Sequence, residues 1–232
     1  MTRTETRISR VQRSKTEARA AYDGMSRWYD LLAGSNEQAF VRLGLQKLLA
    51  VESEVILEIG FGTGQALVAL AQAVGTSGRV YGIDISEGMR RVAWERLKAA
   101  GLEGRVDLEL GDAVQLPFQD HFFDGVFMSF TLELFDTPEI PEVLYECRRV
   151  LKEGGRLSVV AMSRMGKAGM MLRLYEWAHE KLSRYLDCRP IFVQQALEQA
   201  GFQVVDSELR SMWGIPVEIV AARDFDLAGG TG

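Results

Sequence analysis

The chain has 232 residues and a formal net charge of −5, and 47% of its residues are hydrophobic and 25% charged. This length suits one α/β domain with a modest accessory region, and the composition is that of a globular protein with a full core. The negative charge argues against nucleic acid held by general electrostatic attraction. No run approaches the roughly 18–20 apolar residues of a membrane-spanning helix.

The cysteines and the N-terminus bear on the cellular compartment. Cys147 and Cys188 stand far apart and lack the spacing of metal ligands or of a CxxC motif. They predict free thiols in a reducing compartment and no metal site. The N-terminus is rich in arginine but has no apolar stretch after it, so it does not read as a secretory signal. The expected location is the cytoplasm.

The first 50 residues read as helical, and the core follows them. Helices are expected over residues 14–32 and 37–49, and the first gathers aromatic residues at its end. Short apolar runs then alternate with helical patterns, which predicts a parallel sheet covered on both faces. The expected strands are residues 55–59, 80–83, 106–110, 125–130 and 157–161, and the expected helices are residues 67–74, 87–100 and 138–151. Ser86 is the predicted N-cap of the helix at 87–100, and Gly154-Gly155 the predicted turn into the fifth strand.

The alternation of predicted strands and helices ends after residue 163. A helical insertion is expected there, followed by two strands that complete the core. The expected helices are residues 166–186 and 191–200, and the expected strands lie near residues 204–209 and 217–222. The chain is therefore divided into residues 1–50, 51–163, 164–200 and 201–232.

A glycine loop follows the first predicted strand. Gly60, Gly62 and Gly64 form a G-x-G-x-G motif, Glu58 lies two residues before it, and Asp84 closes the second strand. Ligands of open parallel sheets bind at the carboxyl ends of the strands, where the strand order reverses. Glycines let the main chain approach a ligand closely, and a carboxylate after the second strand can accept hydrogen bonds from both ribose hydroxyls.

Two cofactors have a ribose that suits this layout. NAD requires G-x-G-x-x-G, because its pyrophosphate lies against a helix N-terminus, whereas Gln65 occupies the third glycine position here. Glu58 would also repel a pyrophosphate. S-adenosylmethionine (SAM) carries an ammonium and a sulfonium, which a carboxylate attracts. SAM is the expected cofactor, with NAD and a tight turn without ligand as the alternatives.

Two further segments extend the predicted site. Asp112, in Gly111-Asp112-Ala113 after the third strand, can accept a hydrogen bond from an adenine amino group, although it could instead cap a helix. Ser129 and Phe130, at the end of the fourth strand, are expected beside the methionine part of the cofactor.

The motifs in this order resemble the class I SAM-dependent methyltransferases, and within them the ubiquinone/menaquinone biosynthesis C-methyltransferase group. The segments that carry the resemblance are VILEIGFGTG (55–64), GIDIS (82–86), GDAVQLPF (111–118), FDGVFMSFTLELF (123–135) and RRVLKEGGRLSVV (148–160). The resemblance implies a Rossmann-like α/β fold with a seven-stranded, mostly parallel sheet whose last strand is antiparallel. It also implies an N-terminal helical lid, and the helical insertion after strand five completes the expected fold.

The resemblance assigns roles to individual residues. Glu58 and the loop glycines would hold the aminocarboxypropyl group, Asp84 the ribose and Asp112 the adenine. The Tyr-Asp helix that closes over the cofactor in this family resembles Tyr22-Asp23 and Tyr29-Asp30. The full set of expected cofactor residues is Tyr22, Tyr29, Glu58, Gly60, Phe61, Gly62, Gly64, Asp84, Ile85, Met89, Gly111, Asp112, Ala113, Ser129 and Phe130.

The candidates for catalysis are weaker. Methyl transfer from a sulfonium is an in-line displacement, so a base is needed only when the acceptor must lose a proton. The candidates are Glu133, His179 and Tyr22, against the alternatives of a helix-start carboxylate at 133 and a surface histidine at 179. His121 is expected in a solvated loop at the far end of the sheet. Where the quinone enzymes tend to carry Arg-Asn after the fourth strand, this chain has Glu133-Leu134. The resemblance therefore supports methyl transfer well and a quinone substrate poorly.

The predicted function is methyl transfer from SAM to a small, largely apolar or lipid- or quinone-like acceptor. The Met- and aromatic-rich helix at 166–186 would form a wall of its pocket, or else pack on the sheet or on a second subunit. Peripheral contact with a membrane and a homodimer are left open. The alternatives are a protein or nucleic-acid methyltransferase, and a SAM-binding protein without catalysis.

Overall fold

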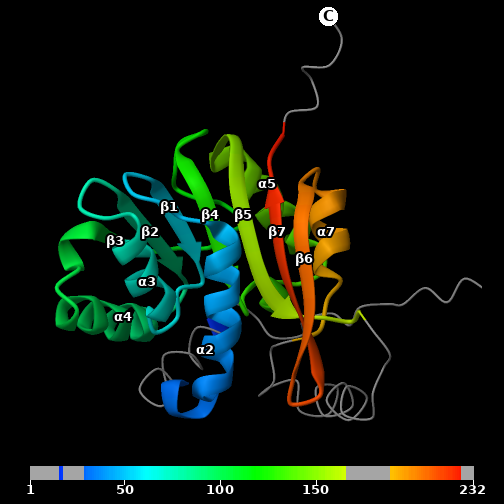
Figure 1. Ribbon diagram of the computed structural model, residues 1–232, viewed down its shortest axis with the longest axis horizontal. Coiled ribbons are helices and arrows are strands. Elements are labelled where there is room, and N and C mark those ends of the chain that lie inside the picture. Colours follow the sequence, from blue (N-terminus) through cyan, green and yellow to red (C-terminus); the bar gives the residue numbers. More distant parts are fainter. Residues whose placement is uncertain (1–15, 18–28, 166–188, 226–232) are drawn as a thin grey trace, which may run out of the picture.

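The computed structural model describes residues 16–17, 29–165 and 189–225. They form a seven-stranded sheet in the order β3-β2-β1-β4-β5-β7-β6 (Figure 1). The first five strands are parallel, and β7 runs antiparallel to both of its neighbours. The expected mostly parallel sheet with an antiparallel last strand is confirmed. The expected lid around Tyr22 and the helix at 166–186 lie outside the described residues.

The elements have the following bounds. The strands are β1 (Val55–Ile59), β2 (Arg79–Asp84), β3 (Val106–Leu110), β4 (Phe123–Ser129), β5 (Leu151–Met162), β6 (Gln203–Met212) and β7 (Ile215–Arg223). The α-helices are α2 (Tyr29–Leu48), α3 (Gln65–Ala73), α4 (Glu87–Ala99), α5 (Glu139–Val150) and α7 (Val193–Gln199). Two short 3₁₀ turns are η1 (Glu103–Arg105) and η2 (Leu132–Leu134).

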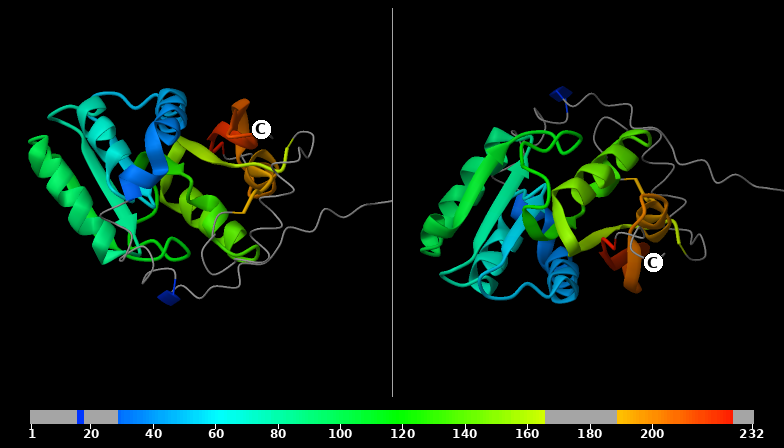
Figure 2. Two further views of the ribbon diagram at one scale, coloured as in Figure 1. Left: turned by 90° about the horizontal axis from the view of Figure 1, so that it is seen from below. Right: turned by 90° about the horizontal axis from the view of Figure 1, so that it is seen from above.

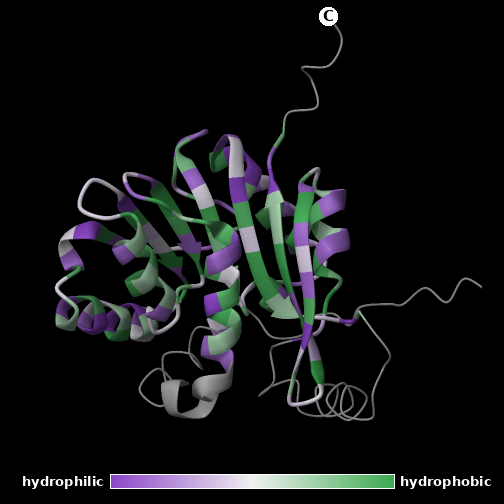
Figure 3. Ribbon diagram, in the orientation of Figure 1, coloured by the Kyte–Doolittle hydropathy of each residue, from purple (hydrophilic) through white to green (hydrophobic). Residues whose placement is uncertain are grey.

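Both faces of the sheet are buried, which explains why its central strands are apolar at nearly every position (Figure 3). Successive side chains of a strand point to opposite faces. Thus Phe127 packs in the layer formed with α2, α3 and α4, while Val126 and Met128 pack in the layer formed with α5 and α7. Figure 2 shows these helices on the two sides of the sheet.

Helix α2 corrects the prediction of two helices over 14–32 and 37–49, because a single helix runs through the expected break. Gly34 in a helix interior costs about 1 kcal/mol relative to alanine, and tertiary packing offsets that cost. A Cβ on Gly44 would lie 2.4 Å from Val160 Cγ2, so the helix lies directly on the sheet. Ser158 Oγ also donates a hydrogen bond of 2.8 Å to Gly44 O. This packing carries the N-terminal part of α2 toward the carboxyl ends of the strands.

Strand β5 corrects a second prediction. The expected turn at Gly154-Gly155 lies inside the strand, which begins at Leu151 and shifts its register against β4 between Phe123 and Gly125. Gly154, with a φ of 71°, donates its N–H to Asp224 O, and Asp224 N–H donates to Gly155 O. The glycines therefore allow an irregular strand to continue.

The prediction that Ser86 caps α4 is confirmed, because its side chain accepts a hydrogen bond from Met89 N–H.

The strand order indicates where a ligand would bind. β1 lies between β2 and β4: the chain runs outward from β1 through β2 to β3, and then returns to the other side of β1 to form β4. At such a switch point the loops at the carboxyl ends diverge and leave a crevice. The glycine loop leaves β1 at this point.

Of the helices that the structure describes, none is long and apolar enough to cross a membrane.

Candidate active site

Main-chain hydrogen bonds align the ends of three parallel strands. Gly60 N–H donates to Ile83 O at 2.8 Å, which extends the pairing of β1 with β2. Gly111 N–H donates to Asp84 O at 3.0 Å, which does the same for β2 and β3. These bonds bring the glycine loop, Asp84 and the segment that holds Asp112 to one edge of the sheet, as predicted.

The three loop glycines all adopt left-handed conformations, with φ values of 71°, 51° and 81° at Gly60, Gly62 and Gly64. A Cβ at Gly60 would lie 2.3 Å from Thr131 Oγ1, and a Cβ at Gly64 would lie 2.8 Å from Ala93 Cβ. These two glycines therefore allow close packing on β4 and α4. At Gly62 a Cβ would meet no atom within 4 Å, so this glycine borders open space.

The open position at Gly62 supplies a test. We expect Gly62→Ala to weaken SAM binding at least tenfold, because the methyl group would enter the space of the ligand. Gly101→Ala is a matched control: Gly101 also has a positive φ, of 66°, and an open Cβ position, but it follows α4, away from the loop. Both variants should lose a similar amount of thermal stability from backbone strain. Equal SAM affinity of the two variants in calorimetry would contradict the placement of the ligand against Gly62.

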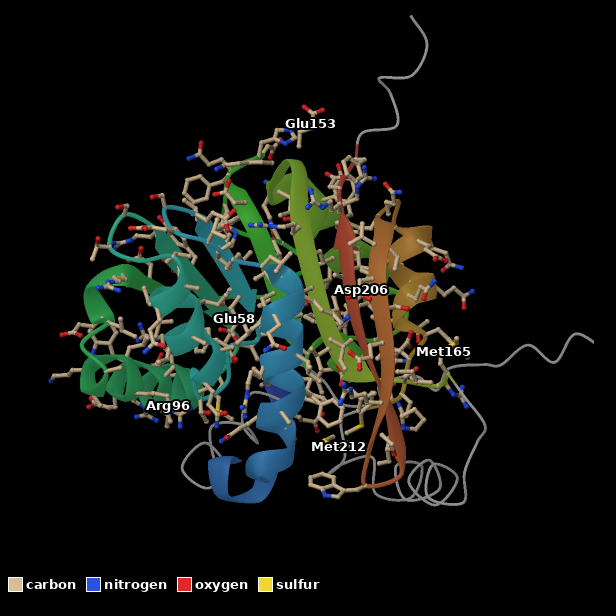
Figure 4. All side chains as sticks on the ribbon, in the orientation of Figure 1. Glu58, Arg96, Glu153, Met165, Asp206 and Met212 are labelled. Carbon is tan, nitrogen blue, oxygen red and sulfur yellow. The ribbon has the colours of Figure 1, made fainter. Side chains whose placement is uncertain are left out.

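Glu58 is a buried carboxyl group with an unused oxygen. Its side chain is 2% exposed, and Oε2 has no hydrogen-bond partner within residues 29–165 and 189–225. Burial, with a smaller contribution from the charge of Asp84, raises the pKa of Glu58 well above its usual range. A buried acceptor without a donor is costly, and a cationic ligand removes that cost. The site thus fits the ammonium of SAM. Figure 4 shows Glu58 beside α2, with Glu153 at the opposite edge of the sheet.

Asp84 is held in place by two main-chain donors. Its Oδ2 accepts a hydrogen bond of 3.0 Å from Gly62 N–H, and its Oδ1 accepts one of 2.9 Å from Ser86 N–H. The carboxylate therefore links the glycine loop to the first turn of α4. Its side chain is half-buried, and an oriented carboxylate at this edge suits the paired hydroxyls of a ribose.

Asp112 lies in a turn, and the structure excludes the alternative of a helix cap, because no helix begins between β3 and β4. Its Oδ1 accepts a hydrogen bond of 3.2 Å from Val114 N–H, and its main-chain oxygen accepts one from Gln115 N–H. Ala113 beside it is buried. The turn presents a carboxylate with an apolar neighbour, a combination that suits an adenine ring.

Phe130 has a strained main chain at the end of β4. Its φ is 50°, a conformation that non-glycine residues rarely adopt. Its N–H donates to Val160 O at 2.7 Å, and its ring meets Phe40 of α2 edge-on at 6.4 Å. Ser129 beside it is half-buried, and Ser129 O accepts a hydrogen bond from Thr131 Oγ1. The strain directs the chain after β4 across the glycine loop, an arrangement that sequence patterns do not reveal.

The remaining predicted cofactor residues show less about a bound ligand. The Phe61 ring packs in the core, close to Gly82, so only its main chain can border the ligand. Met89 is buried in the same layer, and Ile85 is half-buried after Asp84. Tyr29 is the first residue of α2. Tyr22 and His179 lie outside the described residues.

Glu133 lies in the first turn of η2, as the alternative of a helix-start carboxylate expected, and its side chain is fully buried. Its Oε1 accepts a hydrogen bond of 3.1 Å from Met162 N–H, while Oε2 has no hydrogen-bond partner in the part of the chain that is described. Burial, opposed by main-chain hydrogen bonds, raises its pKa to about 8, with Glu37 adding to the shift and Arg189 reducing it. Sequence reasoning missed Glu37 and the role of Arg189, which come from distant segments.

His121 lies at the opposite end of β4 from this site, as predicted. It is exposed, and its Nδ1 lies 3.0 Å from Leu151 O. Among the described residues no group of His, Cys, Asp or Glu could hold a metal ion.

Comparison with known proteins agrees with this geometry. The model of a methyltransferase domain family matches residues 56–155. A demethylmenaquinone methyltransferase of Symbiobacterium thermophilum is 31% identical over 192 residues, which cover 72% of this chain and 76% of that protein. The ubiquinone/menaquinone biosynthesis C-methyltransferase UbiE of Pseudomonas fluorescens is 34% identical over 157 residues, which cover 68% and 59%.

Among solved structures, the (4+2)-cyclase SpnF matches with a TM-score of 0.75 and 19% identity, over 94% of this chain and 98% of that one. This likeness shows a shared fold alone. The sequence relationship goes further, since it covers about three quarters of a named methyltransferase. The chain is a SAM-dependent methyltransferase and belongs to class I of these enzymes, as a relative of the ubiquinone and menaquinone biosynthesis C-methyltransferases.

Proposed function

We propose that the enzyme methylates a small aromatic acceptor with a lipid-like body, of the quinol class. The observation that carries this proposal is an apolar layer that reaches the carboxyl edge beside the cofactor loop. Phe40, Phe130 and Met212 belong to that layer, and Met162 packs against it. Such a surface favours an apolar acceptor over a small polar amine. The names of the relatives, which specify demethylmenaquinone and ubiquinone/menaquinone biosynthesis, support the same class.

Each residue at the carboxyl edge of the sheet has its own role in this proposal. Glu58 would hold the ammonium, Asp84 the ribose and Asp112 the adenine, with Gly62 leaving the main chain close to the ligand. When bound, SAM supplies an electrophilic methyl group. The apolar layer would hold the acceptor against that methyl group and keep water out, which accounts for most of the rate enhancement in such a displacement.

The location and partners of the enzyme follow as further proposals. Trp213, at the tip of the β6–β7 hairpin on the same edge, is 56% exposed. Tryptophan is favoured at the boundary of lipid and water, so we place the cytoplasmic enzyme in peripheral contact with a membrane that holds its acceptor. The homodimer stays a prediction. We likewise propose that the N-terminal segment 1–50 provides a lid over the cofactor and that residues 166–186 form a wall of the acceptor pocket.

A panel of acceptors tests the substrate class. We expect a short-chain 2-prenyl-1,4-naphthoquinol to be methylated at least tenfold faster than simple phenols, and small polar amines and acids to show no turnover. The measurement is release of S-adenosylhomocysteine, with the methylated product identified by mass spectrometry. Asp84→Ala serves as the control for cofactor-dependent turnover. Methylation of the polar compounds alone would contradict the proposal, and methylation of vesicle aminophospholipids alone would replace the quinol class by a lipid headgroup.

A further inference from the structure

Three charged side chains from distant segments converge at the carboxyl ends of β4 and β5. Glu133 comes from η2, Glu37 from α2, and Arg189 from the segment before α7. Arg189 is 1% exposed and donates hydrogen bonds to Thr137 Oγ1 at 2.8 Å and to Phe135 O at 2.5 Å. The guanidinium therefore fixes the chain directly after η2. The charges of Glu37 and Arg189 both shift the pKa of Glu133, Glu37 upward and Arg189 downward.

The segment that holds Glu133 packs on the cofactor loop. Thr131, two residues before it, lies against Gly60, with its Oγ1 3.4 Å from Gly60 O. On the other side, Met162 N–H at the end of β5 holds Oε1 of Glu133. The carboxyl group is thus anchored by one oxygen between β4 and β5. The other oxygen is buried and meets no donor among the residues that the structure describes.

An anchored carboxyl group with one unused oxygen is costly to bury, because that oxygen loses its hydrogen bonds to water and gains none in the protein. Glu218, another buried carboxyl group at the same edge, shows the contrasting arrangement. It accepts hydrogen bonds from Ser163 Oγ at 2.5 Å, Val193 N–H at 3.1 Å and Gln194 N–H at 3.4 Å. Glu218 therefore has a sufficient structural role, in joining β5 and β7 to α7. The second carboxylate oxygen of Glu133 accepts no comparable structural hydrogen bond among the described residues.

We propose that Glu133 is the base that accepts the proton which a hydroxyl group of the acceptor loses during methyl transfer. This inference rests on the proposed function, because only an acceptor with an ionisable hydroxyl group requires such a base. It narrows the acceptor to a phenol or quinol whose hydroxyl group activates the methylated ring position.

The proposed step balances as follows. The O–H bond of the acceptor breaks and its proton moves to Oε2 of Glu133, while the ring carbon forms a bond to the methyl group. The C–S bond of the donor breaks, and its electron pair stays on sulfur. The ring carbon then loses its own proton to water, and the oxygen recovers the proton held by Glu133. The net products are the methylated quinol, S-adenosylhomocysteine and one proton.

The environment suits a base that works near neutral pH. A carboxyl group with an ordinary pKa would be a poor base for a phenolic hydroxyl group, whereas burial raises the pKa of Glu133 to about 8. Glu37 faces it from α2 and has its own pKa raised by burial to about 7. Arg189 opposes the shift from the segment before α7. Because the ionised form is the active one, kcat should rise with pH and level off above about 8.

The test compares Glu133→Gln with the exposed-carboxylate control Glu142→Gln on α5. With the prenyl-naphthoquinol we expect kcat of Glu133→Gln to fall about 10²- to 10⁴-fold and to lose its rise with pH, while the Kd for SAM changes less than twofold. Glu142→Gln should match the wild type in all three measurements. An unchanged kcat in a folded Glu133→Gln protein would overturn the proposal. Wild-type protein without turnover on any quinol or phenol would instead contradict the proposed function.

A second measurement needs no variant and decides the question even if Glu133→Gln does not fold. A halogenated naphthol that is already ionised at pH 6 supplies no proton for a base to remove. Wild-type kcat on this acceptor should be independent of pH between 6 and 9, in contrast to the ordinary quinol. The same rise with pH on both acceptors would show that Glu133 does not act on the acceptor proton.

Discussion

Replacing Asp84 by alanine should raise the Kd for SAM by about 100-fold or more. The change removes two hydrogen bonds from ribose hydroxyls to a charged acceptor, each contributing about 1.5–3 kcal/mol, and about 1.4 kcal/mol corresponds to a factor of ten. It also removes the acceptor that Gly62 N–H and Ser86 N–H share. The loop conformation should therefore loosen together with the loss of ribose contacts.

Titration calorimetry measures this effect, with circular dichroism to show that the variant is folded. Asp107→Ala is the matched control, because Asp107 lies on the neighbouring strand β3 and pairs with Arg79 at the other end of the sheet. It should bind SAM like the wild type. A folded Asp84→Ala protein with unchanged affinity would show that Asp84 does not hold the ribose.

Replacing Glu58 by glutamine should weaken SAM binding by roughly 30-fold or more, because truncating one partner of a buried charge pair costs about 2–5 kcal/mol. The binding should also lose a proton-linked component. In the free protein, burial raises the pKa of Glu58, whereas a bound ammonium lowers it by favouring the charged form. At a pH between these two values, SAM binding to the wild type should therefore release a proton.

Calorimetry in two buffers with different ionisation enthalpies reveals that proton. The heat of binding should differ between phosphate and Tris for the wild type and for Glu153→Gln, a surface variant at the opposite edge of the sheet. For Glu58→Gln the two heats should agree. Identical heats for the wild type in both buffers would exclude a change in the protonation of Glu58 on binding.

Local sequence patterns were sufficient to predict the sheet and to predict that Glu58, the loop glycines and Asp84 lie at one edge of it. Apolar runs as short as Val55–Ile59 predict buried parallel strands, because both faces of such a strand meet helices. Glu58, the loop glycines and Asp84 each lie at or near the end of a predicted strand, and the carboxyl ends of parallel strands share one edge of the sheet. Their convergence therefore follows from chain order alone.

Only the tertiary structure decided the features that depend on contacts between distant segments. The sequence pattern predicted two helices, over 14–32 and 37–49, but close packing of Gly44 on Val160 supports one continuous helix α2. The sequence suggested that Glu133 could be an ordinary carboxylate at a helix start, and it did not show that the side chain is buried and within the electrostatic influence of Glu37 and Arg189, which are separated from it by 96 and 56 residues. Burial and charge proximity are properties of the folded chain, and they convert an unremarkable glutamate into a candidate base.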